Sequence, residues 1–303
     1  MESAVASSPL PPEIAAEFPF ARHVVEVPAG RLAYVDEGPR GAPPIVCVHG
    51  NPTWSFLFRR IVRAHSREHR VVALDHIGCG LSDKPANATL RLVDHVDNLE
   101  RLVLALGLER ITLLVHDWGG AIGFGFARRH PELVARLVIT NTAAFPSTRM
   151  PWRIRACRTP IVGPFLIRRM NAFAGLATRM AMHRPERLGA TAKAGLLFPY
   201  RNAADRAAIA SFVSDIPMSP AHPSYAELAA TGAALQQFRD RPALVIWGER
   251  DFCFTPAFRE EWQRHLPNAE VVKLASAGHY LFEEAPDEIE RALSSFFARH
   301  PLP

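Results

Sequence analysis

The sequence predicts an α/β fold, with a mostly parallel sheet of eight strands flanked by helices. Compact apolar runs recur along the chain and suit strands that are buried on both faces. Helical patterns separate most of these runs. Polar residues gather directly after several of them, at the edge where open α/β sheets bind ligands.

The chain opens with residues 1–20, rich in Ser, Pro and Ala, which we expect to form a flexible lead-in. Two strand-like runs joined around Gly30 then indicate an antiparallel hairpin, and six further runs indicate the parallel part of the sheet. The predicted strands are His23–Pro28, Arg31–Asp36, Pro44–Val48, Arg70–Asp75, Arg110–His116, Val134–Thr140, Ala243–Trp247 and Ala269–Leu274. The clearest predicted helices are Thr89–Leu106, Gly119–His130 and Pro256–Leu266.

Residues 145–230 break this alternation, because they contain helix-like pieces and several prolines but no strand. We expect a helical cap here, inserted before the last two strands, on a core formed by residues 21–144 and 231–303. The cap holds eleven arginines and one lysine against four acidic residues, a net charge of +8. We interpret these cations as solvated helix faces; attraction to anions, a membrane surface or an acidic partner is the alternative.

Large apolar side chains of this segment are candidates to line a substrate pocket. They are Phe145, Trp152, Phe165, Phe173, Leu176, Leu196, Leu197, Phe198 and Phe212.

Composition excludes several classes of protein. Among 303 residues, 48% are hydrophobic and 21% charged, as in ordinary globular proteins. The net charge of +5 comes from scattered basic residues without a nucleic-acid-binding motif, so we expect no nucleic acid. No apolar stretch approaches the roughly 20 residues of a membrane span and no signal peptide is visible, so we expect a soluble, cytoplasmic protein. The four cysteines and 13 histidines show no metal-binding spacing, and we expect neither metal nor cofactor.

Asp117 stands at a sharp transition between a buried strand and a helix. Trp118, Gly119 and Gly120 follow it, with small residues where the chain must turn and pack closely. This arrangement is typical of a nucleophile elbow, with Asp in the position that Ser usually holds. An Asp that merely caps a helix would explain the same residues. We expect the helix N-terminus to keep the pKa of Asp117 low.

Three further loops fit the same template. The loop His49–Trp54 follows a strand, where a backbone N–H completes an oxyanion hole, although Gly, Asn and Pro also favour a plain turn. Asp251 follows the strand Ala243–Trp247, and His279 follows the last predicted strand. Nucleophile, acid and histidine therefore occur in the chain order of a hydrolase triad.

The motifs His49–Trp54, Asp75–Pro85, His116–Gly120, the Asp251 loop and Gly278–His279 resemble those of the haloalkane dehalogenases, over nearly the whole chain beyond the lead-in. The resemblance implies an α/β-hydrolase fold. It also implies that Asp117 is the nucleophile, His279 the base and Asp251 the triad acid, because the stretch Thr140–Ala144, where some members carry the acid, has no carboxylate. Asn51 and Trp118 match the pair that binds the halide.

In the implied reaction, Asp117 attacks a saturated carbon and forms an alkyl ester. His279, oriented by Asp251, then activates water to hydrolyse that ester, while backbone N–H groups of Asn51 and Trp118 hold the oxyanion. The main reading is therefore hydrolytic dehalogenation of a small apolar substrate.

The same subfamily includes β-lactone decarboxylases of long-chain olefin biosynthesis, which the loop Asp75–Pro85 and the cap segment Phe212–Pro217 resemble especially. Decarboxylation of a β-lactone to an alkene and CO2 is therefore a close alternative, with a carboxylate in place of the halide. If this alternative holds, we also expect the protein to associate with other enzymes of olefin biosynthesis.

Three other readings stay open. Epoxide hydrolases use the same elbow, but they need two cap tyrosines, for which only Tyr200 and Tyr225 are available, and Asn51 stands where they usually have an aromatic residue. A dinucleotide-binding loop is suggested by Gly78 and Gly80, but Asp83 replaces its third glycine. An inactive binding scaffold is the non-enzyme alternative, and the complete triad argues against it.

Overall fold

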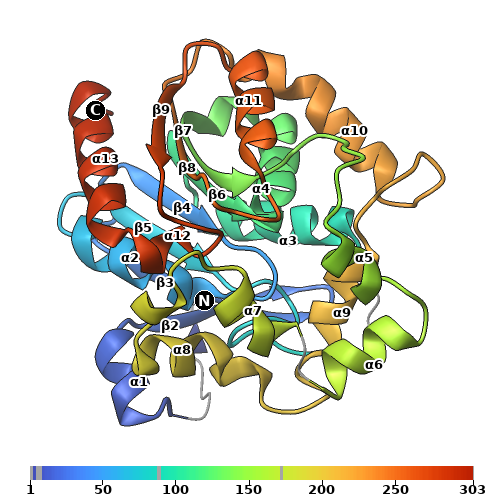
Figure 1. Ribbon diagram of the computed structural model, residues 1–303. Helices are drawn as coiled ribbons and strands as arrows, with labels where there is room; N and C mark the ends of the chain where they lie inside the picture. The colour runs from blue at the N-terminus through green and yellow to red at the C-terminus, as the bar shows by residue number, and fades with distance from the viewer. Residues whose placement is uncertain (1–2, 5–8, 87–89, 171–172, 303) are drawn as a thin grey trace.

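The computed structural model describes residues 3–4, 9–86, 90–170 and 173–302. The α/β fold is confirmed (Figure 1), and all eight predicted strands are present with bounds within two residues of those expected. They are β2 (Arg22–Val27), β3 (Gly30–Glu37), β4 (Pro44–Val48), β5 (Arg70–Leu74), β6 (Ile111–Asp117), β7 (Val134–Thr142), β8 (Ala243–Gly248) and β9 (Glu270–Leu274). A two-residue strand, β1 (Ser3–Ala4), extends the sheet at one edge.

The strand order is β1-β2-β3-β5-β4-β6-β7-β8-β9. Strands β4 to β9 all run parallel, whereas β1, β2 and β3 pair antiparallel with their neighbours. From β4 the chain first adds β5 on one side of β4, and it then crosses over to add β6 on the other side. The order in which strands are added to the sheet therefore reverses at β4. The ends of the parallel strands therefore form one edge on which loops from distant parts of the sequence meet.

Successive side chains of a central strand enter the two opposite cores of the molecule. In β4, Val46 and Val48 belong to one core, while Ile45 and Cys47 belong to the other. This alternation explains why the parallel strands read as continuous apolar runs, since both faces of the sheet are covered.

Two layers of helices cover the sheet, one on each face (Figure 1). The first layer consists of α3 (Leu92–Ala105), α4 (Trp118–Arg129), α10 (Tyr225–Ala234) and α11 (Pro256–His265). The second consists of α2 (Arg59–His65), α12 (Leu281–Glu284) and α13 (Pro286–Arg299). The helix expected at Thr89–Leu106 begins later, at Leu92, because the carboxylate of Asp94 accepts the backbone N–H of Arg91 and fixes the helix start there; Thr89 lies outside the described residues.

The segment expected as a lead-in contains a packed helix, α1 (Pro12–Glu17). Ile14 and Phe18 are each only 2% exposed, and the Phe18 ring lies 5.2 Å from that of Trp54. The second half of this segment is therefore anchored to the core by apolar burial.

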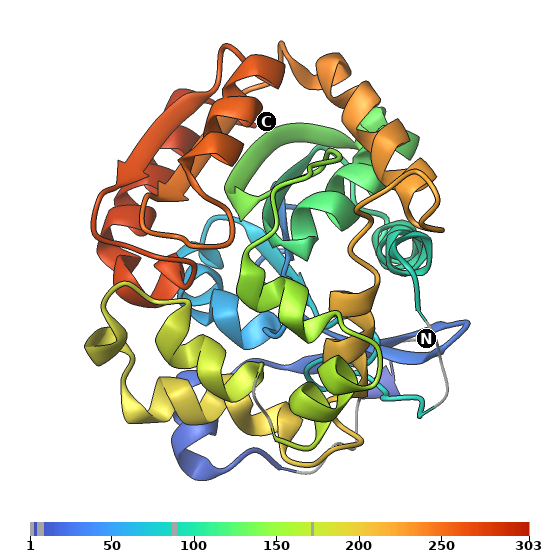
Figure 2. The ribbon, with the colours of Figure 1, turned by 45° about the vertical axis from the view of Figure 1, so that its right-hand side comes forward.

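The helical segment expected before the last two strands lies between β7 and β8, and Figure 2 brings part of it to the front. Its helices are α5 (Trp152–Cys157), α6 (Val162–Arg168), α7 (Ala174–Met180), α8 (Ala190–Leu197) and α9 (Ala207–Ser214). The first-layer helix α10 follows them. Within the described residues, no helix has the length and apolar character needed to cross a bilayer.

Candidate active site

The turn from β6 into α4 places Asp117 at the carboxyl edge of the sheet. Its φ of 53° is in the left-handed region, which is costly for a residue with a Cβ and is found at functional sites. Glycines make the close packing around it feasible. A Cβ on Gly50 would overlap Oδ1 of Asp117, and a Cβ on Gly119 would overlap the carbonyl oxygen of Val48.

The two oxygens of the Asp117 carboxylate have different environments. Oδ1 accepts the backbone N–H of Asn51 at 2.6 Å. Oδ2 lies 3.6 Å from Nε2 of His279. Because Oδ1 is held by a backbone N–H group, Oδ2 is the oxygen available to attack a substrate carbon.

His279 and Asp251 complete the expected group of three. Nδ1 of His279 lies 2.7 Å from Oδ2 of Asp251, whose side chain is fully buried. Oδ1 of Asp251 accepts the backbone N–H of Cys253 at 2.7 Å. The contact with Asp251 keeps a hydrogen on Nδ1 of His279 and leaves Nε2 directed toward Asp117.

The charges of this group are strongly coupled. Burial disfavours the histidine cation, yet the adjacent carboxylates of Asp251 and Asp117 outweigh burial and raise the pKa of His279 to about 9. Burial raises the pKa of Asp117 above its usual range, against the opposing effects of the His279 charge and the N–H groups of Trp118 and Asn51. The expectation of a low pKa at Asp117 was therefore wrong, since the loss of hydration outweighs the helix N-terminus.

Asn51 and Trp118 lie beside Asp117 in the wall of the same cavity. The side-chain NH2 of Asn51 donates one hydrogen bond, to the carbonyl of Ile209 at 3.2 Å, which leaves its second N–H available. The indole N–H of Trp118 has no acceptor in the part of the chain that the structure describes. Two neutral donors are thus available next to the free oxygen of Asp117.

Two supporting residues were not among the expected site residues. Asn141, at the end of β7, donates its NH2 to Oδ2 of Asp251 at 2.9 Å and accepts the backbone N–H of Gly248 at 2.7 Å. Asn141 lies in the stretch Thr140–Ala144, where some members of the family carry the triad acid, and this position could have indicated its role. Glu284, fully buried, accepts the backbone N–H groups of Gly278, His183 and Arg184 at 2.8 to 2.9 Å. It ties the His279 loop to the cap, and the sequence offered no signal for it.

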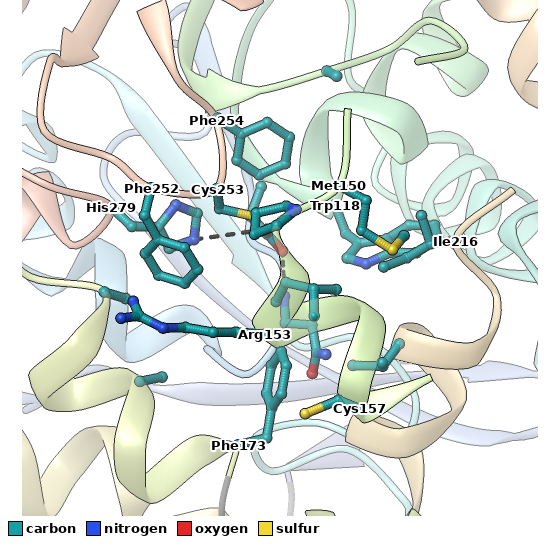
Figure 3. Close-up of a pocket in the computed structure, with 18 of the residues that line it drawn as sticks. Trp118, Met150, Arg153, Cys157, Phe173, Ile216, Phe252, Cys253, Phe254 and His279 are labelled. Atoms are coloured by element: carbon teal, nitrogen blue, oxygen red, sulfur yellow. Dashed lines mark hydrogen bonds and ion pairs between the residues drawn. The ribbon is translucent and has the colours of Figure 1, made fainter. Parts of the chain in front are cut away.

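A cavity of about 480 Å³ opens above Asp117 and His279. Figure 3 shows His279, Phe252, Cys253 and Phe254 on one side of it, with Trp118, Met150 and Ile216 across from them. Its walls are mostly apolar side chains, the greater part of them from the cap and others from the loop between β8 and α11 and from the core. The arrangement suits an apolar molecule with a single polar reacting centre.

Four of the nine expected pocket residues line this cavity, namely Phe145, Trp152, Phe173 and Leu176. For the other five the expectation was wrong. Phe165 is 56% exposed on α6, and Leu196, Leu197 and Phe198 pack against other parts of the cap and core. Phe212 stacks on His95 with ring centroids 4.4 Å apart, behind the cavity wall.

The structure does not support the epoxide hydrolase and dinucleotide-binding interpretations. Neither Tyr200 nor Tyr225 lines the cavity, and the Tyr200 hydroxyl donates to the carbonyl of Thr53 at 2.9 Å, so the tyrosine pair of an epoxide hydrolase is not formed by these residues. Gly78 and Gly80 lie in a turn built around Asp75, whose carboxylate accepts the N–H of Leu81 at 2.8 Å. Among the residues described, the next helix after that turn begins only at Leu92, so the turn does not lead into a helix N-terminus that would hold a dinucleotide phosphate.

The family model described as alpha/beta hydrolase fold matches residues 43–286. A cis-3-alkyl-4-alkyloxetan-2-one decarboxylase of Xanthomonas campestris pv. campestris is 42% identical over 286 residues, covering 91% of this chain and 95% of the relative. The enzyme of the same name from Shewanella oneidensis is 39% identical, covering 92% of this chain and 88% of the relative.

Haloalkane dehalogenases are also similar to the chain. One from Mycobacterium marinum is 35% identical, covering 91% of this chain and 94% of the relative. The solved structure of a haloalkane dehalogenase from Bradyrhizobium elkani superposes with a TM-score of 0.84 at 29% identity, covering 92% of this chain and 98% of that one.

Proposed function

We propose that this protein catalyses the decarboxylation of a cis-3,4-dialkyl-oxetan-2-one to an alkene and CO2. The chain belongs to the α/β-hydrolase family, and within it to the haloalkane dehalogenase-like group, which includes β-lactone decarboxylases. The observation that carries the choice is the order of identity, 39% and 42% to two relatives with that activity in their names against 35% to a haloalkane dehalogenase. β-Lactone decarboxylation, which the sequence analysis gave as the alternative to dehalogenation, thus becomes the preferred function.

The first step uses the free oxygen of Asp117. Oδ2 attacks ring carbon 4 from the face opposite the ring oxygen, and the bond from carbon 4 to that oxygen breaks. The lactone opens to a carboxylate that stays attached to carbon 3, while carbon 4 is esterified to Asp117. The indole N–H of Trp118 and the free amide N–H of Asn51 stabilise the new anion as it forms.

The second step needs neither water nor a proton. Attack from the back face leaves the Asp117 oxygen and the carboxylate on opposite sides of the bond between carbons 3 and 4. The bond to the carboxylate breaks, its electron pair forms the double bond, and the bond from carbon 4 to Asp117 breaks. CO2 leaves, Asp117 regains its charge, and the two alkyl groups stay cis.

His279 suits this reaction in its charged form. Its raised pKa of about 9 keeps it an imidazolium at neutral pH, 3.6 Å from Oδ2 of Asp117. There it favours the return of Asp117 to the carboxylate as the alkene leaves. The dry walls of the cavity strengthen these interactions because they exclude water.

Hydrolytic dehalogenation is the second candidate, and the donor pair Asn51 and Trp118 beside Asp117 is the observation that favours it. Here the alkyl ester must be hydrolysed by water, with neutral His279 as base. Formation of the ester removes the Asp117 charge, one of the causes that raise the pKa of His279, and so assists its conversion to a base.

One experiment separates the candidates. Purified protein is given a long-chain cis-β-lactone or 1-bromobutane, and alkene, halide and alcohol are measured. We expect alkene from the lactone at a rate far above halide release. Rapid halide and alcohol formation without alkene would reject the proposal in favour of dehalogenation.

Two variants serve as matched controls. Asp117→Asn removes the attacking charge and should abolish both activities, whereas Asp240→Asn changes an exposed aspartate and should leave both unchanged. Alkene formation by Asp117→Asn at the normal rate would exclude Asp117 as nucleophile.

A further inference from the structure

The exposed apolar side chains of this protein are concentrated on one part of the cap. Seven of the nine large hydrophobic residues that the described chain exposes fall between residues 152 and 180. They are Trp152, Ile161, Val162, Phe165, Met170, Leu176 and Met180, with exposed fractions from 39% to 86%. We call this part of α5, α6 and α7, with the loops around them, the cap face; Figure 2 shows these helices at the front of the molecule.

The cap face is also strongly basic. Residues 145–185 contain eight arginines and no Asp, Glu or Lys. Six of the arginines are exposed, and none of the six forms an ion pair with an acidic side chain among the described residues. They are Arg149, Arg153, Arg155, Arg168, Arg169 and Arg179. Arginines interleaved with Trp, Phe and Ile are typical of surfaces that lie in the interfacial layer of a membrane.

The apolar patch continues into the mouth of the cavity. Trp152, Leu176 and Met180 are exposed and also line the cavity above Asp117. Two exposed arginines stand at the same opening, and the guanidinium of Arg153 lies 5.5 Å from the ring centroid of Phe252 on the opposite wall (Figure 3). A molecule on the cap face therefore has a continuous apolar path to the reacting groups.

We propose that the cap face docks on an anionic lipid bilayer, from which apolar substrate enters the cavity directly. Phosphate headgroups pair with the six exposed arginines, whose long stems let the apolar side chains between them reach the acyl chains. A second copy of this chain fits poorly, because a two-fold contact would place arginines against arginines. A protein docked flat on this face would cover the cavity mouth, whereas a bilayer is itself a solvent for apolar substrates.

The proposal is independent of the reaction, because lipid binding can be measured without turnover. Protein is floated with vesicles of phosphatidylcholine alone, or with vesicles of equal parts phosphatidylcholine and phosphatidylglycerol. We expect strong binding to the anionic vesicles, weak binding to the neutral ones, and a decrease as salt is raised.

Two double variants test the two halves of the surface, at positions outside the cavity lining. Arg155→Gln with Arg169→Gln should lower partitioning into anionic vesicles about twenty-five-fold, since each arginine near such a surface contributes about fivefold. Ile161→Ser with Phe165→Ser should lower it at least about tenfold by removing apolar insertion. The matched control is Val93→Ser with Leu104→Ser, which removes two exposed apolar residues from α3 and should bind as the unchanged protein does.

Circular dichroism and activity on a short-chain, water-soluble substrate should stay unchanged in all three variants, which shows that they are folded. The proposal is overturned if the protein does not bind anionic vesicles, or if the control loses as much binding as the cap-face variants. Binding to an acidic polypeptide in the absence of any vesicle binding, or a dimer that both cap-face variants abolish, would also overturn it.

Discussion

Replacing Asp251 by asparagine should lower the pKa of His279 by several units. Asp251 is the first of the groups that raise this pKa to about 9, and its Oδ2 lies 2.7 Å from Nδ1 of His279. Two unit charges about 4 Å apart interact by roughly 4 kcal/mol at an effective dielectric constant of about 20. That energy corresponds to about three pKa units, so Asp251→Asn should bring the histidine near 6.

The asparagine side chain cannot reproduce all the hydrogen bonds that the Asp251 carboxylate accepts. Oδ1 of Asp251 accepts the N–H of Cys253, and Oδ2 accepts from both His279 and Asn141. An asparagine at position 251 has only one acceptor oxygen, so its NH2 must face a donor on one side. Leaving a buried donor without an acceptor costs about 1–3 kcal/mol. We therefore expect reduced stability together with the lowered pKa.

The assay is a pH titration of the imidazole nitrogens by NMR on protein labelled with 15N in histidine. His49, His95 and His116 serve as internal references, because burial lowers the pKa of each and they stay neutral across the range. His279 should titrate near 9 in the unchanged protein and about three units lower in Asp251→Asn. Equal titration midpoints in the two proteins would refute the assignment of Asp251 as the group that holds the proton on His279.

The remaining predictions concern the leaving-group donors, the cap clamp and acid stability. Trp118→Phe should slow the first chemical step about 100-fold to 1,000-fold in single-turnover kinetics, because one donor to the developing anion is lost; an unchanged rate would remove the indole N–H from the mechanism. Glu284→Gln should lower the free energy of unfolding in urea by about 1–3 kcal/mol, because its NH2 must face at least one of three buried backbone donors; Glu290→Gln, an exposed change on α13, is the control. Stability should fall as pH decreases from about 6.5 to about 4, since burial lowers the pKa of His65, His69 and His76 to about 4 and the unfolded chain binds those protons first. The raised pKa values of Asp75 and Asp117 act in the opposite direction, but these two groups are outnumbered by the six buried histidines, which also include His49, His95 and His116. A stability that does not change over this pH range would contradict the burial argument.

The sequence was most informative about the sheet. Each parallel strand is an apolar run because its alternate side chains enter two separate cores, as in β4, and this pattern does not depend on distant contacts. Asp117, Asp251 and His279 could be placed for a related reason. Each lies in the loop that follows a predicted strand, so the topology of the sheet brings them to the same edge.

The cap was less predictable. Its helices α5 to α9 are six to eight residues long, so a hydrophobic residue can face the cavity, the core or solvent with little change in the local pattern. Phe165 and Phe173 illustrate this, since the first is exposed and the second lines the cavity. Glu284 could not be foreseen, because its three partners are backbone N–H groups of loops that only the folded chain brings together.

The central claim is that a carboxylate oxygen of Asp117 becomes covalently bonded to a substrate carbon. Its most direct test is a single turnover with enzyme in excess over a long-chain cis-β-lactone, stopped with acid at successive times and followed by the mass of the peptide that carries Asp117. We predict that this mass rises by that of the intact lactone and returns to its original value as alkene appears. Alkene release with no change in that peptide at any time would contradict the claim.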